Sequence, residues 1–454
     1  MSTNRKLASS ALSVGLVFAM LLTACTGGGD RTDMPAGDTA GQGGEGTGQT
    51  ASDKPAEIVF YSSNNNSKES FDATYGDALR KKFPHYTISY IWSGAPGNKL
   101  PELLASNTRF DVFMQAPGHY EAQAFPVDIQ YDMTELVKRH QVDLNRLDDT
   151  SVDYVKTSSK GQLYFLPIQL DAMVLYYNKS LFDKFGVEYP TDGMTWEQMM
   201  DKARKLTRTE GGIQYYGFST DASTIQGMNP LSLPLADLAT DTPTINKDDR
   251  WKRFFERFYD EPRKMPGYLE AIKQAKGIPT LQHFVNNQNV AMFAYQSGLM
   301  NVWTEQLKAL NWDIVSLPTF PEQSNTGSMA TPQLFGITKM AKDKDAAMNA
   351  LHYLLSDEFQ AELARKGIVP VLKNGAIKDQ LGKQSVYADR NWKALFVNKF
   401  APLAGRPAYY SQLNSIYIKY FKQAALDETD LNSALRLAEE EAVKAIAAFK
   451  AGTQ

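Results

Sequence analysis

The chain has 454 residues and a formal net charge of −3 at pH 7, and 11% of its residues are aromatic. This charge balance argues against nucleic acid or a polybasic membrane contact as a partner. The length exceeds what one hydrophobic core usually supports, so we expect two lobes. Cys25 is the single cysteine, which leaves no second thiol for a disulfide or a zinc–thiolate site.

The N-terminus has the pattern of a secretory signal. Arg5 and Lys6 precede a mostly small and apolar stretch, residues 7–22, which falls short of the ~20 residues of a spanning helix. The segment Leu22–Cys25 (LTAC) resembles the lipobox of bacterial lipoproteins, which implies removal of residues 1–24 and a diacylglyceryl group on the cysteine. A plain signal peptide with a chance cysteine is the alternative. We expect a lipid anchor at the outer face of the cytoplasmic membrane.

The composition changes after the cysteine. Nine of the 29 residues from Thr26 to Lys54 are glycine, and Met34 is the only large apolar side chain among them. We therefore expect residues 25–54 to form the acylated cysteine and a flexible tether. No later stretch reaches 18 uncharged apolar residues, so the rest is predicted to be extracytoplasmic without spanning the membrane.

Strand and helix patterns alternate at the start of the folded part. The predicted elements are a strand at 57–61, a helix at 71–83, a strand at 86–92, a helix at 99–107 and a strand at 110–114. This order predicts a parallel sheet with right-handed crossovers. Ligands bind beyond the carboxyl ends of such strands, so the candidate binding loops are 62–67, 93–98 and 115–120.

Residues 161–207 contain two short motifs and a capped helix. Thr195 and Gln198 have capping-box spacing. The apolar residues after the cap fall on one helix face: Trp196, Met199, Met200, Ala203 and Leu206. Residues 161–167 form a G-x-x-Y-x-x-P element, and residues 177–182 read YNKSLF. With these motifs the chain resembles family 1 of the extracellular solute-binding proteins, the receptors of ABC importers.

Later segments keep the order of that family. Residues 290–298 resemble its A-M strand, and residues 315–321 resemble the strand that ends in a proline. Residues 333–371 resemble the strand–helix–helix segment that closes in G-x-x-P. The resemblance covers about residues 57–449.

The resemblance implies an α/β fold of two discontinuous lobes joined by a hinge, the periplasmic-binding-protein type II architecture, with ligand in the cleft between the lobes. We expect lobe 1 to comprise residues 55–170 and 291–340. Lobe 2 is expected to comprise residues 171–290 and 341–454. The crossover strands are expected near 168–173 and 289–293. A C-terminal apolar stripe predicts a final helix packed on a lobe: Leu431, Leu435, Ala438, Ala442, Ile446 and Phe449.

A sugar cleft needs flat aromatic rings together with carboxylates and amides. Matched to the family's positions, the candidate ligand-binding residues are Asn64, Asn65, Gln115, Asp171, Asn229, Gln296, Trp303, Tyr409 and Tyr410. Ordinary structural roles remain open for them: a solvated turn for the asparagines after the first strand, a hinge residue for Asp171, and core packing for Trp303. Met300 stands two residues after Gly298, where family members often carry an aromatic, so the stacking platform there is uncertain.

The family resemblance implies a monomeric receptor that captures a solute, most readily a mono- or oligosaccharide, and delivers it to the permease of an ABC importer. No catalysis, cofactor or metal is expected, since the histidines lack ligand spacing and neither a G-x-S-x-G elbow nor a P-loop occurs. The alternatives are a surface lipoprotein glycoside hydrolase and a receptor that signals to a membrane sensor. One scaffold serves many ligands, and Arg406 keeps an anionic solute among them.

Overall fold

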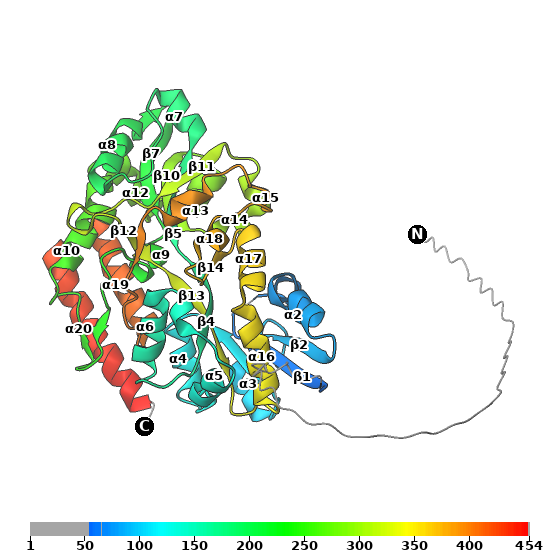
Figure 1. The fold of residues 1–454 in the computed structure, drawn as a ribbon. Helices are drawn as coiled ribbons and strands as arrows, with labels where there is room; N and C mark the ends of the chain where they lie inside the picture. The colour runs from blue at the N-terminus through cyan, green and yellow to red at the C-terminus, as the bar shows by residue number, and fades with distance from the viewer. Residues whose placement is uncertain (1–53, 65, 453–454) are drawn as a thin grey trace, which may run out of the picture. The chain divides into compact units, whose positions relative to one another are not determined.

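Two β-sheets organise the described part of the chain (Figure 1). This computed structural model describes residues 54–64 and 66–452. The sequence predictions for residues 1–53, which include the signal peptide, Cys25 and nearly all of the tether, lie outside the described residues, as does the candidate Asn65. Figure 1 shows strands β5, β7, β10 and β11 in its upper half and β1, β2 and β4 in its lower half.

The first sheet has six strands in the order β14-β4-β13-β3-β1-β2. They are β1 (Ala56–Ser62), β2 (Tyr86–Trp92), β3 (Val112–Gln115), β4 (Leu166–Asp171), β13 (Thr331–Ile337) and β14 (Val369–Pro370). β1 pairs in parallel with both β2 and β3, which confirms the parallel start predicted from the sequence. β13 runs antiparallel to β3 and β4, so the whole sheet is mixed.

Aromatic side chains of β1 pack on both faces of this sheet because successive strand residues point in opposite directions. The ring of Phe60 lies 5.2 Å from that of Phe71, whereas Tyr61 stacks 5.7 Å from Phe113. The helical elements of this lobe are α1 (Lys68–Phe71), the π-helix η1 (Asp72–Gly76), α2 (Asp77–Lys82), α3 (Leu100–Ala105), α4 (His119–Ala124), α5 (Thr134–Arg139), η2 (Leu144–Arg146), α6 (Asp149–Ser158), α16 (Lys344–Leu354), α17 (Asp357–Arg365) and α18 (Gly375–Lys378).

The second sheet has five strands in the order β11-β5-β10-β7-β6. They are β5 (Met173–Asn178), β6 (Arg208–Glu210), β7 (Ile213–Thr220), β10 (Val290–Gln296) and β11 (Trp312–Ser316). β10 pairs in parallel with β7 and antiparallel with β5. Every residue of β5 is buried, as expected for a central strand that helices cover on both faces.

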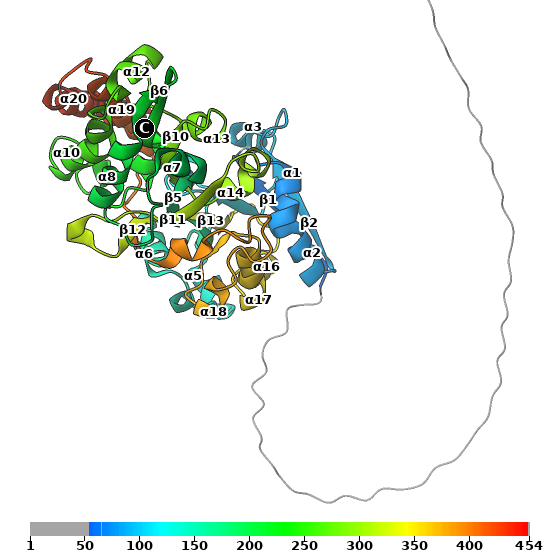
Figure 2. The same ribbon diagram turned by 90° about the horizontal axis from the view of Figure 1, so that it is seen from above.

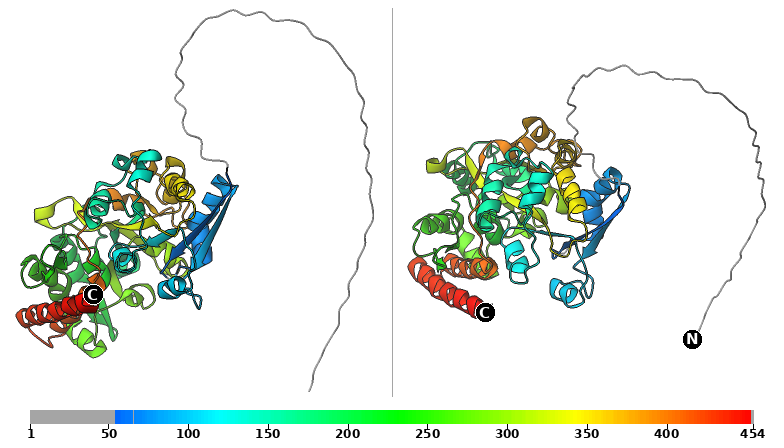
Figure 3. Two further views of the ribbon diagram at one scale, coloured as in Figure 1. Left: turned by 90° about the horizontal axis from the view of Figure 1, so that it is seen from below. Right: turned by 60° about the horizontal axis from the view of Figure 1, so that its bottom comes forward.

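The helices of the second lobe come from two distant parts of the sequence. They are α7 (Lys179–Phe185), α8 (Trp196–Leu206), α9 (Ala222–Gly227), α10 (Arg250–Phe255), the π-helix η3 (Glu256–Asp260), α11 (Glu261–Arg263), α12 (Tyr268–Ala275), α13 (Leu281–Val285), α14 (Leu299–Val302), α15 (Thr304–Leu307), η5 (Trp392–Phe396), α19 (Tyr410–Ala425) and α20 (Leu431–Gly452). Figures 2 and 3 show α19 and α20 side by side at the end of the molecule away from β1 and β2.

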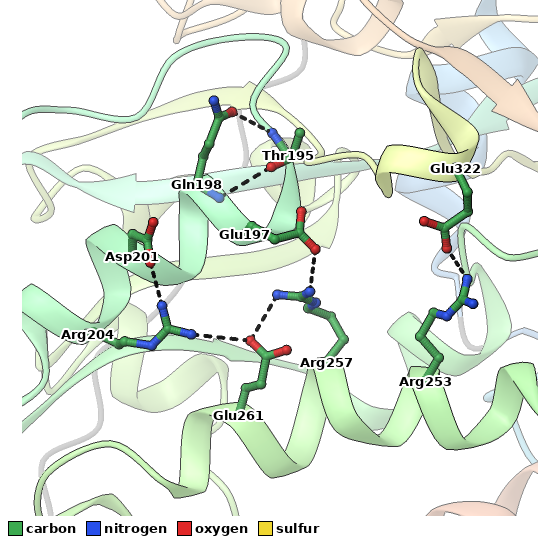
Figure 4. Close-up of polar contacts among 9 residues, drawn as sticks. All are labelled: Thr195, Glu197, Gln198, Asp201, Arg204, Arg253, Arg257, Glu261 and Glu322. Atoms are coloured by element: carbon green, nitrogen blue, oxygen red, sulfur yellow. Dashed lines mark hydrogen bonds and ion pairs between the residues drawn. The ribbon is translucent and has the colours of Figure 1, made fainter.

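Helix α8 forms as its sequence predicts. The Thr195 hydroxyl accepts from the Gln198 N–H at 3.3 Å, and the Gln198 side chain accepts from the Thr195 N–H at 2.9 Å (Figure 4). All five apolar residues predicted for its inner face are buried. Gly217 of β7 lets the helix approach, since a Cβ there would lie 2.0 Å from the Ala203 carbonyl oxygen.

The expected lobe boundaries need correction at two places. Strands β10 and β11, in the range 291–340 expected for lobe 1, pair within the second sheet, whereas β14 and the helices α16 and α17, expected in lobe 2, belong to the first. A buried apolar strand does not encode which sheet it joins, because its pairing partners are distant in sequence. The expected crossover at 289–293 is therefore wrong: it lies inside β10.

Among the described residues, the chain passes between the lobes at Ala172, at 317–330 and at 379–391. The first passage confirms the crossover expected near 168–173. The shorter elements are η4 (Pro321–Gln323), β12 (Thr326–Met329), which pairs with β15 (Lys399–Ala401), and β8 (Ala236–Asp237), which pairs with β9 (Thr242–Pro243). The expected C-terminal stripe lies on α20, where Leu435, Ala438, Ala442 and Ile446 are buried.

Within residues 54–64 and 66–452, no helix combines the length and the apolar character that crossing a bilayer requires.

Candidate functional site

A cavity of about 240 Å³ lies where the two lobes meet, and we call it the Asp171 cavity. From the first lobe it is lined by Asn66, Ser70, Phe71, Thr74, Tyr75, Tyr90, Met114, Gln169, Leu170, Asp171, Gln333, Gly367, Ile368 and Val369. From the second lobe it is lined by Ser297, Gly298, Asn301 and Val302. A solute held here would touch both lobes, as ligand-driven closure requires.

Asp171 sits at the point where the chain leaves the first sheet. It ends β4, and its carboxylate Oδ1 accepts from the Ser297 hydroxyl at 2.7 Å and from the Gly298 N–H at 3.1 Å. Gly298 permits this approach, because a Cβ there would lie 2.9 Å from the other carboxylate oxygen. One side chain of the first lobe is thereby joined to the segment that follows β10 of the second.

Burial raises the pKa of the Asp171 carboxyl above its usual value, although the hydrogen bond from Ser297 acts in the opposite direction. No lysine, arginine or histidine is among the described residues that line the cavity. A buried carboxylate without a nearby cation favours a ligand that donates hydrogen bonds or carries positive charge.

The first-lobe lining of the cavity also combines aromatic rings with fixed polar groups. Phe71 and Tyr90 stack with their ring centroids 4.5 Å apart. The Tyr75 hydroxyl donates to the Gln169 side-chain carbonyl at 2.7 Å, and the Tyr90 hydroxyl donates to the Asn66 carbonyl at 3.1 Å. Tyr75 lies in the π-helix η1, and such single π-turns are frequent at functional sites.

The candidates near the first strand have different surroundings. Asn64 is half-buried, and its backbone carbonyl accepts from the Ser93 hydroxyl at 2.9 Å. The neighbouring Asn66 lines the Asp171 cavity. Gln115 is only 1% exposed; it donates to the Ser63 hydroxyl and therefore ties the loops after β1 and β3 together. Asp171 and Asn66 are thus brought together at the cavity, whereas Asn64 and Gln115 are not among its lining residues.

Two amide candidates of the second lobe have structural partners. Asn229 is fully buried; it donates to the Gln226 and Leu233 carbonyls at 2.9 and 3.2 Å and accepts from the Leu233 N–H at 2.8 Å, which fixes a turn. Gln296 is half-buried, with its amide nitrogen 3.4 Å from the Met228 sulfur. Neither residue lines the Asp171 cavity.

The three aromatic candidates also lie apart from the cavity lining. Trp303 is half-buried and packs against the core. Tyr409 is buried, with its hydroxyl 2.5 Å from Asp241 and its ring 5.7 Å from that of Phe449. Tyr410 lies under a guanidinium group, with Arg406 Cζ 4.9 Å from its ring centroid.

Sequence reasoning missed several cavity residues, among them Tyr75, Tyr90, Gln169 and Asn301. Tyr90 stands three residues before the candidate loop 93–98, so its place near a strand end was available as a signal. The π-turn that carries Tyr75 has no recognisable signature in the sequence.

A larger cavity of about 980 Å³ opens in the first lobe, and we call it the first-lobe cavity. Its lining comes from the ends of β1 and β2, from α3 and from α4, and includes Tyr61, Ser63, Leu100 and Gln123. No described residue of the second lobe takes part in that lining. Among the described residues no group of three or more histidine, cysteine or acidic side chains could hold a metal ion.

The profile of the family described as "Bacterial extracellular solute-binding protein" matches residues 62–361. The chain belongs to this family. The best curated matches include a Brucella abortus protein named as a binding protein, 24% identical over 48% of this chain and 53% of that protein. A mannitol-binding protein of Pseudomonas aeruginosa is 30% identical over 33% of this chain and 32% of its own length. The chain thus spans about half the length, or less, of the curated relatives it matches.

Solved structures agree with the family assignment at the level of the fold. An ABC substrate-binding protein of Listeria monocytogenes, in complex with cycloalternan, superposes with a TM-score of 0.67 at 18% identity, over 87% of this chain and 100% of that chain. The expected type II solute-binding fold with two α/β lobes is therefore confirmed. The chain is therefore a member of a family of solute-binding proteins, and the chemistry of its own cavity is the guide to its solute.

Proposed function

We propose that this solute-binding protein captures a small neutral sugar or polyol in the Asp171 cavity and delivers it to the permease of an ABC importer. The observation that carries the proposal is the half-buried carboxylate of Asp171, placed between the lobes with hydroxyl and amide groups around it and no basic side chain among the described lining residues. Hinge closure around the solute is the motion expected of such receptors.

The chemistry of the cavity matches a polyhydroxylated molecule. Sugar hydroxyls can donate to the Asp171 carboxylate and exchange hydrogen bonds with the Gln169, Asn301 and Gln333 amides, while the Tyr90 ring offers an apolar face. A solute lacking those hydroxyls would leave buried polar groups unpaired, which costs about 1–3 kcal/mol for each group. An anionic solute would in addition meet a carboxylate without a compensating cation.

The names of relatives support a carbohydrate ligand. One curated relative is named a mannitol-binding protein, and the Listeria structure contains the oligosaccharide cycloalternan. These names belong to those proteins, and the shared fold alone does not choose among sugars. The carboxylate and amides of this chain supply the local reason for preferring a sugar or polyol over other solutes.

A thermal-shift screen tests the proposal directly. Full-length protein is heated with mannitol, mannose, tagatose, glucose and a polyamine, each at a concentration series. A true ligand at about 100 times its Kd stabilises the protein by ~2.7 kcal/mol, which appears as a rise in Tm. A screen in which none of the sugars or polyols raises Tm contradicts the proposal.

Asp171→Asn is the variant that locates the site. Asparagine keeps an oxygen that can accept from Ser297 and Gly298, so the fold is retained, but the charged acceptor for ligand hydroxyls is lost. We expect at least a tenfold increase in Kd, since hydrogen bonds to charged groups are worth ~1.5–3 kcal/mol. Asp128→Asn, at an exposed carboxylate paired with Lys339, is the matched control. Equal Kd values for Asp171→Asn and the wild type would refute the site assignment.

A further inference from the structure

Arg406 joins the two lobes through backbone carbonyl groups. Its guanidinium donates to the Pro117 carbonyl at 3.3 Å and to the Gly227 carbonyl at 2.6 Å. Pro117 follows β3 in the first lobe, and Gly227 ends α9 in the second. The Arg406 residue is 9% exposed and its guanidinium lies over the Tyr410 ring, so a well-packed charged side chain bridges the lobes.

The first-lobe segment that contacts Arg406 allows its backbone to lie close to the arginine side chain. Gly118 has φ +81°, and a Cβ at this position would come 3.0 Å from Arg406 Cβ. Behind it, Glu121 is 4% exposed and accepts from the Tyr154 hydroxyl and the Gly118 N–H, both at 2.6 Å. Burial raises the pKa of Glu121, while the charge of Arg406 acts in the opposite direction. Two carbonyls thus bind the guanidinium, and the charge of the buried Glu121 interacts with it electrostatically.

A short series of contacts links the Asp171 cavity to the arginine. From Asp171, contacts run through Ser297 to its chain neighbour Gln296, and from Gln296 to Met228, which follows Gly227. The loop 115–120 and the start of α19, two segments expected from the sequence to face a ligand, contact each other here through Arg406. A solute long enough to reach this contact would have to separate Arg406 from the Pro117 or the Gly227 carbonyl.

The first-lobe cavity differs from the Asp171 cavity in its lining. The described residues that line it come from one lobe alone, whereas both lobes line the Asp171 cavity, so a solute held in the Asp171 cavity contacts both lobes in this structure. The volume of the Asp171 cavity is about 240 Å³, which lies below the ~300–1,000 Å³ usual for drug-sized ligands. That volume suits one sugar ring or an acyclic polyol.

We propose that Arg406 is a specificity-determining residue that closes one end of the inter-lobe cleft and restricts the solute to a single sugar ring or an acyclic polyol. This inference rests on the proposed carbohydrate function and adds the size class of the solute. It concerns the length of the ligand, which neither the fold nor the names of relatives fix.

Binding of a graded series tests the size limit. Calorimetric titration of the full chain uses mannitol, mannose, mannobiose and mannotriose, followed by glucose, maltose and maltotriose. The wild type should bind a monosaccharide or polyol at least tenfold more tightly than the matching di- and trisaccharide. In Arg406→Ala the affinity for the longer sugars should rise at least tenfold, while that for the single ring changes less than threefold. Arg436→Ala, which removes an exposed arginine paired with Glu440 on α20, should behave as the wild type.

A wild type that binds mannotriose or maltotriose as tightly as the single sugar overturns the size limit, even though the carbohydrate function then stands. Unchanged affinity of Arg406→Ala for the longer sugars overturns it equally. Arg406→Lys, which keeps the charge but lacks the forked donor geometry, should lie between the wild type and the alanine variant.

A ligand-free measurement separates the two proposals. Spin labels at Lys138→Cys in α5 and Lys252→Cys in α10, in a Cys25→Ser background without other thiols, report the distance between the lobes by pulsed electron resonance. Arg406→Ala should lengthen or broaden that distance distribution, and an unchanged distribution overturns the closing role of Arg406. If the distance changes but none of the sugars binds either protein, the carbohydrate function fails while the closing role stands.

Discussion

At the scale of single residues, the Asp171 carboxylate lowers the stability of the ligand-free fold at neutral pH and is also the proposed hydrogen-bond acceptor for the ligand. Its half-buried carboxylate accepts from Ser297 and Gly298, and the loss of solvent raises its pKa. An acid whose pKa is higher in the folded than in the unfolded state stabilises the fold below its usual pKa, and that contribution is lost as the pH rises through the raised value. A partly buried ionised group of this kind lowers the stability of the fold, and contacts elsewhere in the structure must offset that loss.

The Asp171 pKa predicts a pH-dependent difference in stability between the wild type and Asp171→Asn. At pH 7 and without ligand, the variant should unfold at a higher Tm, because it removes a buried charge. The difference should shrink as the pH falls below the usual carboxyl pKa of ~4, where the wild-type group becomes protonated in both the folded and the unfolded state. Differential scanning calorimetry of both proteins from about pH 3 to about pH 7.5 measures it. A variant that is less stable at every pH contradicts the raised pKa.

Single residues also show what sequence reasoning could find. Asp171 was identified from its position after a motif proline, and the structure places it in the cavity. Its partners could not be found in this way, because Ser297 and Gly298 reach it across 126 and 127 positions of sequence. Asn229 matches a polar ligand residue in type, yet its three hydrogen bonds go to neighbouring backbone. Residue type does not distinguish a turn-fixing amide from a ligand-facing one.

At the scale of elements, α8 and the segment from α10 to α11 are held together by ion pairs (Figure 4). Arg257 of η3 lies between two carboxylates, 2.6 Å from Glu197 and 2.9 Å from Glu261, and its side chain is 11% exposed. Arg253, one turn earlier, pairs with Glu322, and both of these side chains are exposed. The π-turn at η3 adds a residue to the helix and was not visible in the sequence, whereas the capping box of α8 was.

The two arginines form a matched pair for a stability measurement. Arg257→Met should lower the free energy of unfolding by about 1–3 kcal/mol, because it removes a largely buried cation from the partly buried Glu261, which keeps only Arg204 at 3.8 Å, and from the exposed Glu197. Arg253→Met should cost less than about 1 kcal/mol, since exposed ion pairs contribute little. Urea denaturation followed by circular dichroism gives both values. Equal losses for the two variants would show that burial of Arg257 does not set the strength of its pairs.

At the scale of the whole molecule, the two lobes and their α/β class followed from length, element order and family motifs. The assignment of residues 290–316 to a lobe did not, because β10 is apolar and buried from Val290 to Ala294 and would suit a central position in either sheet. Parallel and antiparallel partners of such a strand are chosen by the packing of the complete fold. Local sequence patterns therefore predicted which segments form strands and helices. Strand pairing in the complete fold determines the lobe to which each segment belongs.

The lipid anchor predicted from the sequence is tested through Cys25. Labelled palmitate should be incorporated into the wild-type chain and should be absent from Cys25→Ser, which should also leave the membrane fraction. Two acyl chains are needed because one gives only marginal residence, with ~0.8 kcal/mol for each buried methylene. Cys25→Ser should bind solute with unchanged Kd, since the cavity lies in residues 66–369. Labelling that persists in Cys25→Ser would contradict the lipobox assignment.

The short passage at Ala172 bears on how the two lobes move relative to each other. A single residue separates the end of β4 from the start of β5, so the proposed solute anchor, Asp171, stands beside a pivot between the lobes. Groups beside a rotation axis are displaced least when two rigid bodies rotate about it. A sugar bound to this carboxylate therefore keeps its first hydrogen bonds while the two lobes close.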